Sequence, residues 1–181
     1  MIKSNITVGI PFYFKTEPLD LKKAIDSILN QTLKAEYIHL IQDGEVSDEL
    51  AKLIKKYTSQ FNIIKHIVLP KSNLSTVLNI SIKLTKTKYY ARMDSDDISI
   101  KNRFQLQHDF FEKEKNISIL GGWAIEFFQD KDISNNFIKK MPSSKNKIIE
   151  YFHYRNPLVH SSVMFRTNVF KVIGYYNEFF F

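Results

Sequence analysis

Short runs of β-branched and aromatic residues alternate along the chain with longer segments whose apolar residues recur at helical spacing. Four of these runs predict strands, at residues 6–11, 37–41, 62–69 and 89–93. A segment of helical periodicity separates each run from the next. Because parallel strands need crossover connections, this βαβαβαβ order predicts an α/β fold with a mostly parallel central sheet flanked by helices on both faces.

Apolar stripes and terminating residues define the predicted elements. The stripes are Leu21, Ala24, Ile25, Ile28 and Leu29 in the first helix, Leu50, Leu53, Ile54 and Tyr57 in the second, and Leu74, Val77, Leu78 and Ile82 in the third. Ser47 is the predicted N-cap of the second helix, and Asp97 that of a later helix containing residues 103–106. Pro11 is expected to end the first strand, because proline has no N–H to donate.

Three of the predicted strands are followed directly by residues suited to ligand binding. Pro11-Phe12-Tyr13 follows the first strand, Asp43-Gly44 the second, and Asp94 to Asp97 the fourth. In open α/β sheets the ligand lies beyond the carboxyl ends of the strands. We therefore expect these residues at one edge, as a site for a ring, a ribose and a metal-bound diphosphate.

The run Tyr89-Tyr90-Ala91-Arg92-Met93-Asp94-Ser95-Asp96-Asp97 places three carboxylates within four residues. Carboxylates this close raise one another's pKa unless a cation or several donors compensate them, and oxygen ligands of this kind suit Mg²⁺ or Mn²⁺. The alternative is an acidic turn after a strand, since Asp and Ser also favour turns. The two other strand ends nearby favour the metal site.

An ordered set of motifs resembles the nucleotide-sugar glycosyltransferases of the GT-A, family 2 type. The motifs are residues 6–13, Ser27-Ile28-Leu29-Asn30-Gln31-Thr32, Ile41-Gln42-Asp43-Gly44, Leu74 to Asn79, the D-x-D segment at residues 91–97, and Asn156 to Arg166. The stretch Ser47 to Leu50 is most similar to the capsule and amylovoran-biosynthesis branch. The resemblance spans nearly the whole chain and implies a Rossmann-like GT-A fold and an inverting, metal-dependent sugar transfer.

The resemblance also implies roles for single residues. Its donor-binding residues are Pro11, Tyr13, Asp43, Arg92, Asp94 and Ser95, and its metal ligands are Asp96 and Asp94. Asp43 is expected to accept a hydrogen bond from the nucleobase, and Asp94 to lie by the ribose. Arg92 has two interpretations, a contact with the diphosphate or an ion pair with the neighbouring carboxylates.

His160 follows Asn156-Pro157 and precedes a strand predicted at residues 161–165. The resemblance implies that its imidazole contacts the acceptor or the diphosphate, whereas a lone histidine more often has a local structural role. His39 alternates with Ile38 and Leu40 and is predicted to be structural.

The general base that deprotonates the acceptor hydroxyl is expected beyond residue 181. In the resembling family it is an aspartate in a Glu-Asp pair after a Gly-Gly-Tyr-like turn, which Gly174-Tyr175-Tyr176 resembles. Glu178 follows that turn but lies too early to match. We therefore expect a truncated chain in which donor binding survives and transfer is lost.

Composition limits the remaining classes. With 181 residues and 44% hydrophobic content, we expect one GT-A-like domain over residues 1–181, comprising a nucleotide-sugar-binding half at 1–97 and an incomplete acceptor-side half at 98–181. Zero cysteines exclude disulfides and thiolate metal sites, and no apolar stretch reaches the ~20 residues of a membrane span. The formal charge of +7 suits an anionic membrane face or an anionic donor.

The leading hypothesis is a cytoplasmic glycosyltransferase, peripheral on the inner membrane face, that moves a sugar from a UDP-type donor to a polysaccharide, lipooligosaccharide or lipid-linked acceptor. Three alternatives stay open: a non-catalytic nucleotide-sugar-binding remnant, a metal-dependent nucleotidyltransferase and a basic nucleic-acid-binding domain. The carboxylate cluster argues against nucleic acid, because it repels phosphates without a metal. The lack of a Gly-rich phosphate loop argues against nucleotidyl transfer.

Overall fold

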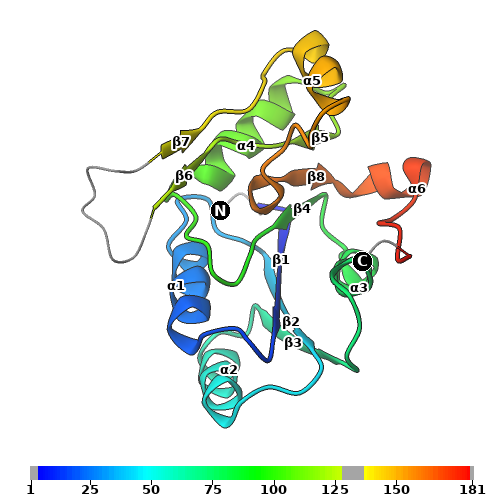
Figure 1. Cartoon of the computed structure of the whole chain (residues 1–181). Helices are drawn as coiled ribbons and strands as arrows, with labels where there is room; N and C mark the ends of the chain where they lie inside the picture. Colours follow the sequence, from blue (N-terminus) through cyan, green and yellow to red (C-terminus); the bar gives the residue numbers. More distant parts are fainter. Residues whose placement is uncertain (1–3, 128–136, 180–181) are drawn as a thin grey trace.

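The computed structural model of the chain describes residues 4–127 and 137–179. Its centre is a six-stranded sheet with the order β3-β2-β1-β4-β8-β5 (Figure 1). The parallel strands are β1 (Ile6–Tyr13), β2 (Tyr37–Asp43), β3 (Ile64–Leu69) and β4 (Tyr89–Arg92). β8 (Met164–Arg166) runs antiparallel to both β4 and β5 (Ile119–Leu120). The predicted mostly parallel sheet is confirmed.

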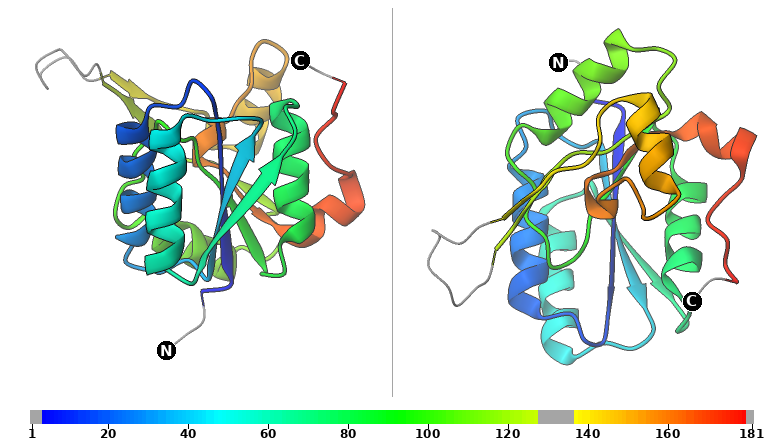
Figure 2. Two further views of the ribbon diagram at one scale, coloured as in Figure 1. Left: turned by 90° about the horizontal axis from the view of Figure 1, so that it is seen from below. Right: turned by 45° about the horizontal axis from the view of Figure 1, so that its top comes forward.

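Helices cover both faces of this sheet, as the periodicity predicts. The helices are α1 (Pro18–Leu29), α2 (Asp48–Gln60), α3 (Leu74–Leu84), α4 (Arg103–Lys113), α5 (Lys145–Phe152) and α6 (Phe170–Ile173). Figure 2 shows α1 and α2 against one face and α3 against the other. Successive residues of β4 divide between two apolar clusters: Tyr89 and Ala91 pack with residues of α1, α2 and α4, and Tyr90 packs with Ile82 of α3.

Four smaller elements complete the second half of the described chain. β6 (Ala124–Glu126) and β7 (Phe137–Lys139) form a separate antiparallel pair. Two short 3₁₀ helices, η2 (His160–Ser162) and η3 (Thr167–Val169), flank β8. No helix in the described residues is long and apolar enough to cross a bilayer.

Pro11 does not end the first strand, because β1 continues to Tyr13. Gly9 accepts a hydrogen bond from the Met93 amide on the β4 side, and the paired part of β4 stops opposite Gly9. Backbone groups two residues apart in a strand face the same way, so the nitrogen of Pro11 faces the space beyond β4. The missing N–H therefore removes no ladder bond.

Two other local predictions are wrong, and one is confirmed. Asp97 does not cap α4, which begins at Arg103 after Asn102. The strand predicted at residues 161–165 is a 3₁₀ turn followed by β8, because the amides of Ser162 and Val163 donate back to the carbonyls of Val159 and His160. Ser47 caps α2 as predicted, since its hydroxyl accepts from the Leu50 amide at 3.3 Å.

Gly9 lies against a buried cluster of hydrogen-bonded polar side chains that joins β2, α3 and β4. The Tyr90 hydroxyl donates to Ser81 Oγ at 3.0 Å, and His39 Nδ1 lies 3.0 Å from the same oxygen. This confirms the structural role predicted for His39. A Cβ on Gly9 would stand 1.8 Å from the Tyr90 hydroxyl and 2.7 Å from Cζ of that ring. Only glycine leaves space for this close packing of β1 on Tyr90.

We expect Gly9→Ala to lower the free energy of unfolding by roughly 3 kcal/mol, because the new methyl group overlaps the Tyr90 ring. Urea unfolding of Gly9→Ala, of Tyr90→Phe and of the double variant Gly9→Ala/Tyr90→Phe measures this loss. The double variant should recover part of the loss, since it removes the hydroxyl but leaves Cζ. Additive effects of the two substitutions would contradict the contact.

Candidate functional site

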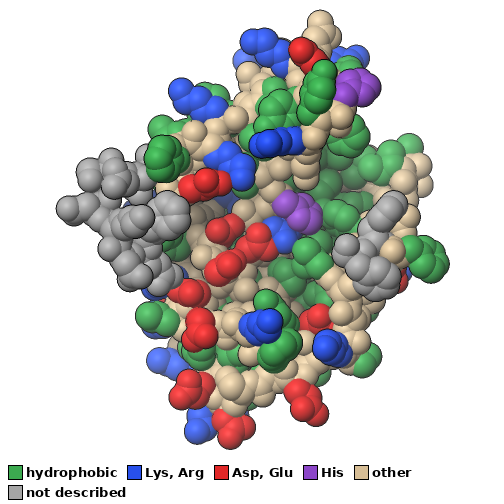
Figure 3. All heavy atoms as spheres, in the orientation of Figure 1, with side chains coloured by type: hydrophobic (Ala, Val, Ile, Leu, Met, Phe, Trp, Pro, Cys, Tyr) green, Lys and Arg blue, Asp and Glu red, His purple; other side chains and the backbone are tan. Residues whose placement is uncertain are grey.

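The site residues gather at the carboxyl edge of the sheet, where β1 has β2 on one side and β4 on the other. The last residue of β1, Tyr13, stands opposite Asp43, the last residue of β2. Asp94 follows the end of β4 by two residues. On the face shown in Figure 3, acidic side chains gather near the middle, beside a histidine and a basic side chain. Sheet topology thus brings three strand ends together, as in other open α/β sheets.

Asp43 lies in an open pocket of about 840 Å³ at the ends of β2 and β3, here called the Asp43 pocket. Its Oδ1 accepts from the backbone amide of Ser72 at 2.6 Å and from the Ser72 hydroxyl at 3.1 Å. Gly44 follows with a φ of +76°, which favours glycine. Phe14 also lines the pocket, with Lys71 over its ring. The pocket thus combines a fixed carboxylate with an aromatic ring.

The sequence singles out Asp43 but not Phe14, Lys71 or Ser72. Phe14 packs edge-on against Tyr13, with ring centroids 5.4 Å apart. Tyr13 itself is 44% exposed, and Pro11 is half-buried inside β1. The sequence signal that could have indicated Phe14 is the aromatic pair Tyr13-Phe14 after the predicted first strand.

Ser95 joins the end of β1 to the carboxylate turn. Thr16 Oγ1 lies 3.4 Å from Ser95 Oγ and accepts from the Tyr13 amide at 3.1 Å. The Thr16 amide in turn donates to the Tyr13 carbonyl at 2.9 Å. Through Thr16, Ser95 therefore fixes the distance between Tyr13 and the Asp94–Asp97 turn.

Asp94 forms an ion pair with Arg92, with 2.5 Å between Nη1 and Oδ2. The Arg92 side chain is 3% exposed and that of Asp94 35%. Burial raises the pKa of Asp94, Arg92 opposes this rise, and the charges of Asp97 and Asp96 add to it. Of the two interpretations of Arg92, the structure shows the ion pair with a neighbouring carboxylate. The Nε atom of Arg92 is buried without a hydrogen-bond partner among the described residues.

Asp96 and Asp97 lie close enough to Asp94 to raise its pKa, and Asp96 is exposed. Within residues 4–127 and 137–179, no three His, Asp or Glu side chains form a ready-made metal cage. The turn therefore fits a hard cation as part of a shell, which phosphate and water oxygens would complete. Mg²⁺ and Mn²⁺ commonly bind in this way.

Buried polar side chains from distant elements hold this turn in place. Gln31, at the end of α1, donates to the Ile100 carbonyl at 2.7 Å and accepts from the Phe104 amide at 3.1 Å. Arg103 donates to the carbonyls of Arg92 at 2.9 Å and Val163 at 3.3 Å. The sequence shows the motif that contains Gln31. It does not show the hydrogen-bond partners of Gln31, which lie about 70 residues further along the chain.

Arg166, the last residue of the Asn156–Arg166 motif, lies outside the site. It is 8% exposed, and its guanidinium donates to the carbonyls of Phe111, Glu114 and Ile117. These carbonyls lie at and beyond the carboxyl end of α4, where backbone acceptors lack helical partners. Arg166 therefore supports the fold.

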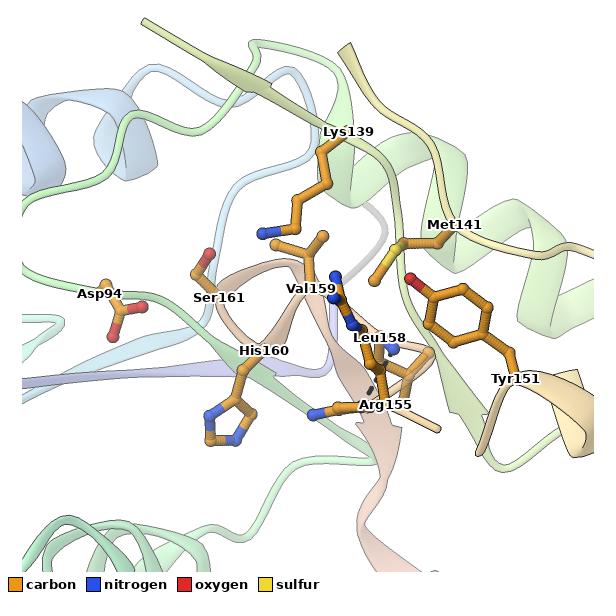
Figure 4. A pocket seen from close by; sticks show the side chains of 10 residues that line it. Asp94, Lys139, Met141, Tyr151, Arg155, Leu158, Val159, His160 and Ser161 are labelled. Atoms are coloured by element: carbon orange, nitrogen blue, oxygen red, sulfur yellow. Dashed lines mark hydrogen bonds between the residues drawn. The ribbon is translucent and has the colours of Figure 1, made fainter. Parts of the chain in front are cut away.

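His160 lines a second pocket of about 380 Å³ that also includes Asp94, here called the Asp94 pocket (Figure 4). Its Nε2 lies 2.9 Å from the Tyr176 hydroxyl. Burial lowers the pKa of His160 to about 4, and the charge of Arg92 contributes to the fall. The imidazole is therefore neutral near pH 7, so it can donate or accept a hydrogen bond there but adds no positive charge.

Asn79 anchors the segment that carries Tyr176. Its Nδ2 donates to the Tyr176 carbonyl at 2.9 Å, and its Oδ1 accepts from the Tyr176 amide at 2.9 Å. The same Nδ2 donates to Glu178 Oε1 at 2.7 Å, and Thr76 donates to Oε2 at 3.1 Å. These bonds lower the pKa of Glu178. Glu178 therefore anchors this segment to Thr76 and Asn79 of α3.

The lowered pKa of His160 predicts an acid-dependent loss of stability. The unfolded state binds a proton near pH 6.5 and the folded state only near pH 4, so stability is complete above pH 6.5 and falls between these values. We expect His160→Gln to reduce this fall by roughly 2 kcal/mol, while His39 and His66 still contribute in both proteins. Urea unfolding at a series of pH values measures it. Identical pH profiles would contradict the burial of a neutral imidazole.

Two glycosyltransferases are similar in sequence to most of this chain. A β-1,3-galactosyltransferase of Escherichia coli, named as using UDP-Gal and α-D-GlcNAc-diphosphoundecaprenol, is 33% identical over 97% of this chain and 63% of its own length. The amylovoran biosynthesis glycosyltransferase AmsE of Erwinia amylovora is 30% identical over 93% of this chain and 61% of its own. The chain thus spans less than two thirds of these relatives.

Solved structures share the fold at low identity. S. aureus TarS 1-349 in complex with UDP-GlcNAc aligns with a TM-score of 0.70 and 17% identity, over 95% of this chain and 48% of that one. The mannosyltransferase PcManGT of Pyrobaculum calidifontis, in complex with GDP-Man and Mn²⁺, aligns with a TM-score of 0.66 and 9% identity, over 97% and 48%. The family description "Glycosyl transferase family 2" matches residues 7–174. The chain belongs to glycosyl transferase family 2 and has the GT-A-like α/β fold of these structures.

Proposed function

We propose that this chain is the donor-binding part of an inverting, metal-dependent glycosyltransferase that takes its sugar from a UDP-type donor. The observation that carries the proposal is the arrangement at the sheet edge, where the Asp43 pocket and the Asp94 pocket lie on either side of the Asp94–Asp97 turn. The family assignment supports sugar transfer over nucleotidyl transfer. Residues 1–97 form the donor-binding half in this proposal, and residues 98–181 belong to the acceptor side.

The donor would extend along the edge of the sheet. The nucleobase occupies the Asp43 pocket, where the carboxylate accepts the imide N–H of uracil and Phe14 or Tyr13 covers the ring. The ribose lies by Asp94, close to the Pro11 end of β1, and Ser95 holds the turn against Thr16. The diphosphate then reaches Asp96, and the sugar faces the Asp94 pocket.

Asp96 and Asp94 would hold the divalent cation, Mn²⁺ or Mg²⁺, from one side. When bound, the cation supplies positive charge for the oxygens of the leaving diphosphate. Arg92 keeps the Asp94 carboxylate in place through its ion pair. This pair leaves the exposed carboxylate of Asp96 available to the cation.

In the transfer step, the acceptor oxygen forms a bond to the anomeric carbon as the bond to the diphosphate breaks. The acceptor proton goes to a base, which we place beyond residue 181 of this chain. Neutral His160 lies beside the incoming acceptor and hydrogen-bonds it or the diphosphate. The chain alone is therefore expected to bind the donor without completing transfer.

The acceptor would be a growing polysaccharide, a lipooligosaccharide or a lipid-linked saccharide. Support comes from the two similar proteins, of which one is named for a diphosphoundecaprenol-linked acceptor and the other for amylovoran biosynthesis. Nucleotide sugars are cytoplasmic donors, so we propose a cytoplasmic protein that meets its acceptor at the inner membrane face. The net charge of +7 favours contact with anionic lipids there.

Calorimetric titration with UDP and GDP, each with and without Mn²⁺, tests the donor site. We expect Mn²⁺-dependent UDP binding that weakens about tenfold or more in Asp96→Asn, because a charge-assisted contact to the cation is lost. Asp43→Asn should weaken UDP binding with and without the metal. Asp109→Asn, on the exposed face of α4, is the matched control and should bind as the unchanged chain does. A UDP affinity that is the same with and without Mn²⁺, and the same in Asp96→Asn as in the unchanged chain, would refute the metal site.

A further inference from the structure

The Asp94 pocket lies on the far side of the carboxylate turn from the Asp43 pocket. In the sheet, β4 separates β1 and β2, which carry Tyr13 and Asp43, from β8, which follows η2. The residues of the pocket come from β7, α5, η2 and the segments that connect them, in addition to Asp94 (Figure 4). With about 380 Å³, it lies within the range of small-ligand pockets, about 300–1,000 Å³. In the proposed arrangement the donor nucleotide lies in the Asp43 pocket, outside this space.

Two cations, Lys139 and Arg155, line this pocket. Lys139 Nζ lies 2.9 Å from Glu126 Oε1, and an ammonium with three N–H groups keeps donors for a second partner. Arg155 is exposed and has no ion-pair partner among the described residues. Figure 4 shows Asp94 and Tyr151 at opposite ends of the labelled side chains, with Lys139 and Arg155 between them. The pocket therefore offers an anion site on the side away from Asp94.

The remaining wall is apolar and suits a sugar ring. Tyr151, Met141 and Leu158 line it, and the Tyr151 ring comes from α5. Sugar rings expose C–H groups that pack on apolar and aromatic surfaces, while their hydroxyls need polar partners. Ser161 and the neutral imidazole of His160 provide such partners in the same pocket. The pocket thus combines a sugar-binding wall with a cationic rim.

Large exposed apolar side chains lie next to pocket residues in the sequence. Phe152 is 72% exposed and Tyr154 82%, and both lie between Tyr151 and Arg155 in the sequence. Ile138, beside Lys139, is 56% exposed, and Trp123 is 57% exposed with Lys140 over its ring. Aromatic side chains mixed with lysines are typical of surfaces that lie at a lipid headgroup boundary. The segments that carry Lys139 and Arg155 thus also carry exposed apolar side chains suited to contact with a lipid chain.

We infer that the Asp94 pocket binds the phosphate group that joins an acceptor sugar to its lipid, with Arg155 and Lys139 as the phosphate-binding cations. The acceptor sugar lies on the Tyr151 wall with a hydroxyl directed toward Asp94 and the donor sugar. The lipid chain leaves across Phe152 and Tyr154. The inference rests on the proposed function and names the acceptor class for the same site. Guanidinium binds phosphate in a two-pronged contact, which makes Arg155 the stronger of the two cations.

Binding of two matched probes to the whole chain tests this inference. The first is N-acetylglucosaminyl diphosphate esterified with a decyl chain, and the second is decyl N-acetylglucosaminide, which lacks phosphate. Trp123, the one tryptophan of the chain, donates to the carbonyl of Met141, a pocket residue, at 3.0 Å, so its fluorescence reports binding. We expect the diphosphate probe to bind at least tenfold more tightly.

The variants Arg155→Gln and Lys139→Gln should each weaken the diphosphate probe about tenfold and leave the phosphate-free probe unchanged. Lys145→Gln removes a charge from α5 outside the pocket and should change neither. Arg155→Lys should retain part of the affinity. Thermal unfolding confirms that the exposed substitutions leave the fold intact.

Several results would overturn the inference. They are equal binding of the two probes, no binding of the diphosphate probe at millimolar concentration, and an unchanged affinity in both Arg155→Gln and Lys139→Gln. Titration of the same variants with UDP and Mn²⁺ separates the two proposals. If Arg155→Gln weakens UDP instead of the acceptor probe, the cations serve the donor and the inference fails. If UDP does not bind at all while the probe pattern holds, the donor proposal fails and the acceptor site stands.

Discussion

The buried guanidinium of Arg103 holds the two sides of the site together. It is 8% exposed, and it donates to the carbonyl of Arg92 at the end of β4 and to that of Val163 after η2. One of these segments leads to Asp94, and the other carries His160. Burial lowers the pKa of Arg103 to about 10, with a contribution from the charge of Arg92, so the group stays protonated near pH 7. A charge buried at this depth is tolerated because carbonyl oxygens and Gln107 satisfy its donors.

The sheet could be predicted from the sequence because each strand and helix leaves a local periodic signal. The stripe of Leu21 to Leu29 and the run at residues 37–41 needed no knowledge of their partners. Pro11, Asp97 and residues 161–165 were placed wrongly because their conformation depends on what lies beside them. Pro11 stays in β1 only because β4 has already ended on that side. Residues 160–162 form a 3₁₀ turn because the amides of Ser162 and Val163 donate back to Val159 and His160, and only from the Val163 carbonyl onward does the chain bond to β4.

The site, too, has features that follow from local sequence and features that depend on the folded chain. The positions of Asp43, Asp94 and Asp96 follow from strand ends, and these can be found in a sequence. Their fixation depends on contacts such as Gln31 to Phe104 and Asn79 to Tyr176, which join residues about 70 and 97 positions apart. In the Asp94 pocket the sequence indicated Asp94 and His160 but not Lys139, Tyr151 or Arg155, since β7, α5 and η2 meet there only in the folded chain. Sequence motifs located Asp43 and the Asp94–Asp97 turn better because each lies within a single strand-to-helix connection.

The charge pattern of the site separates anions of different kinds without depending on pH. Carboxylates in the Asp94–Asp97 turn need a divalent cation before a diphosphate can approach, whereas Lys139 and Arg155 attract phosphate directly. His160 lies in the Asp94 pocket too, but its pKa of about 4 keeps it uncharged across the physiological range. A phosphate diester has no titration near neutral pH, while a monoester gains charge near pH 6. The gain in charge expected of a monoester ligand is therefore absent from a diphosphate that is substituted at both ends.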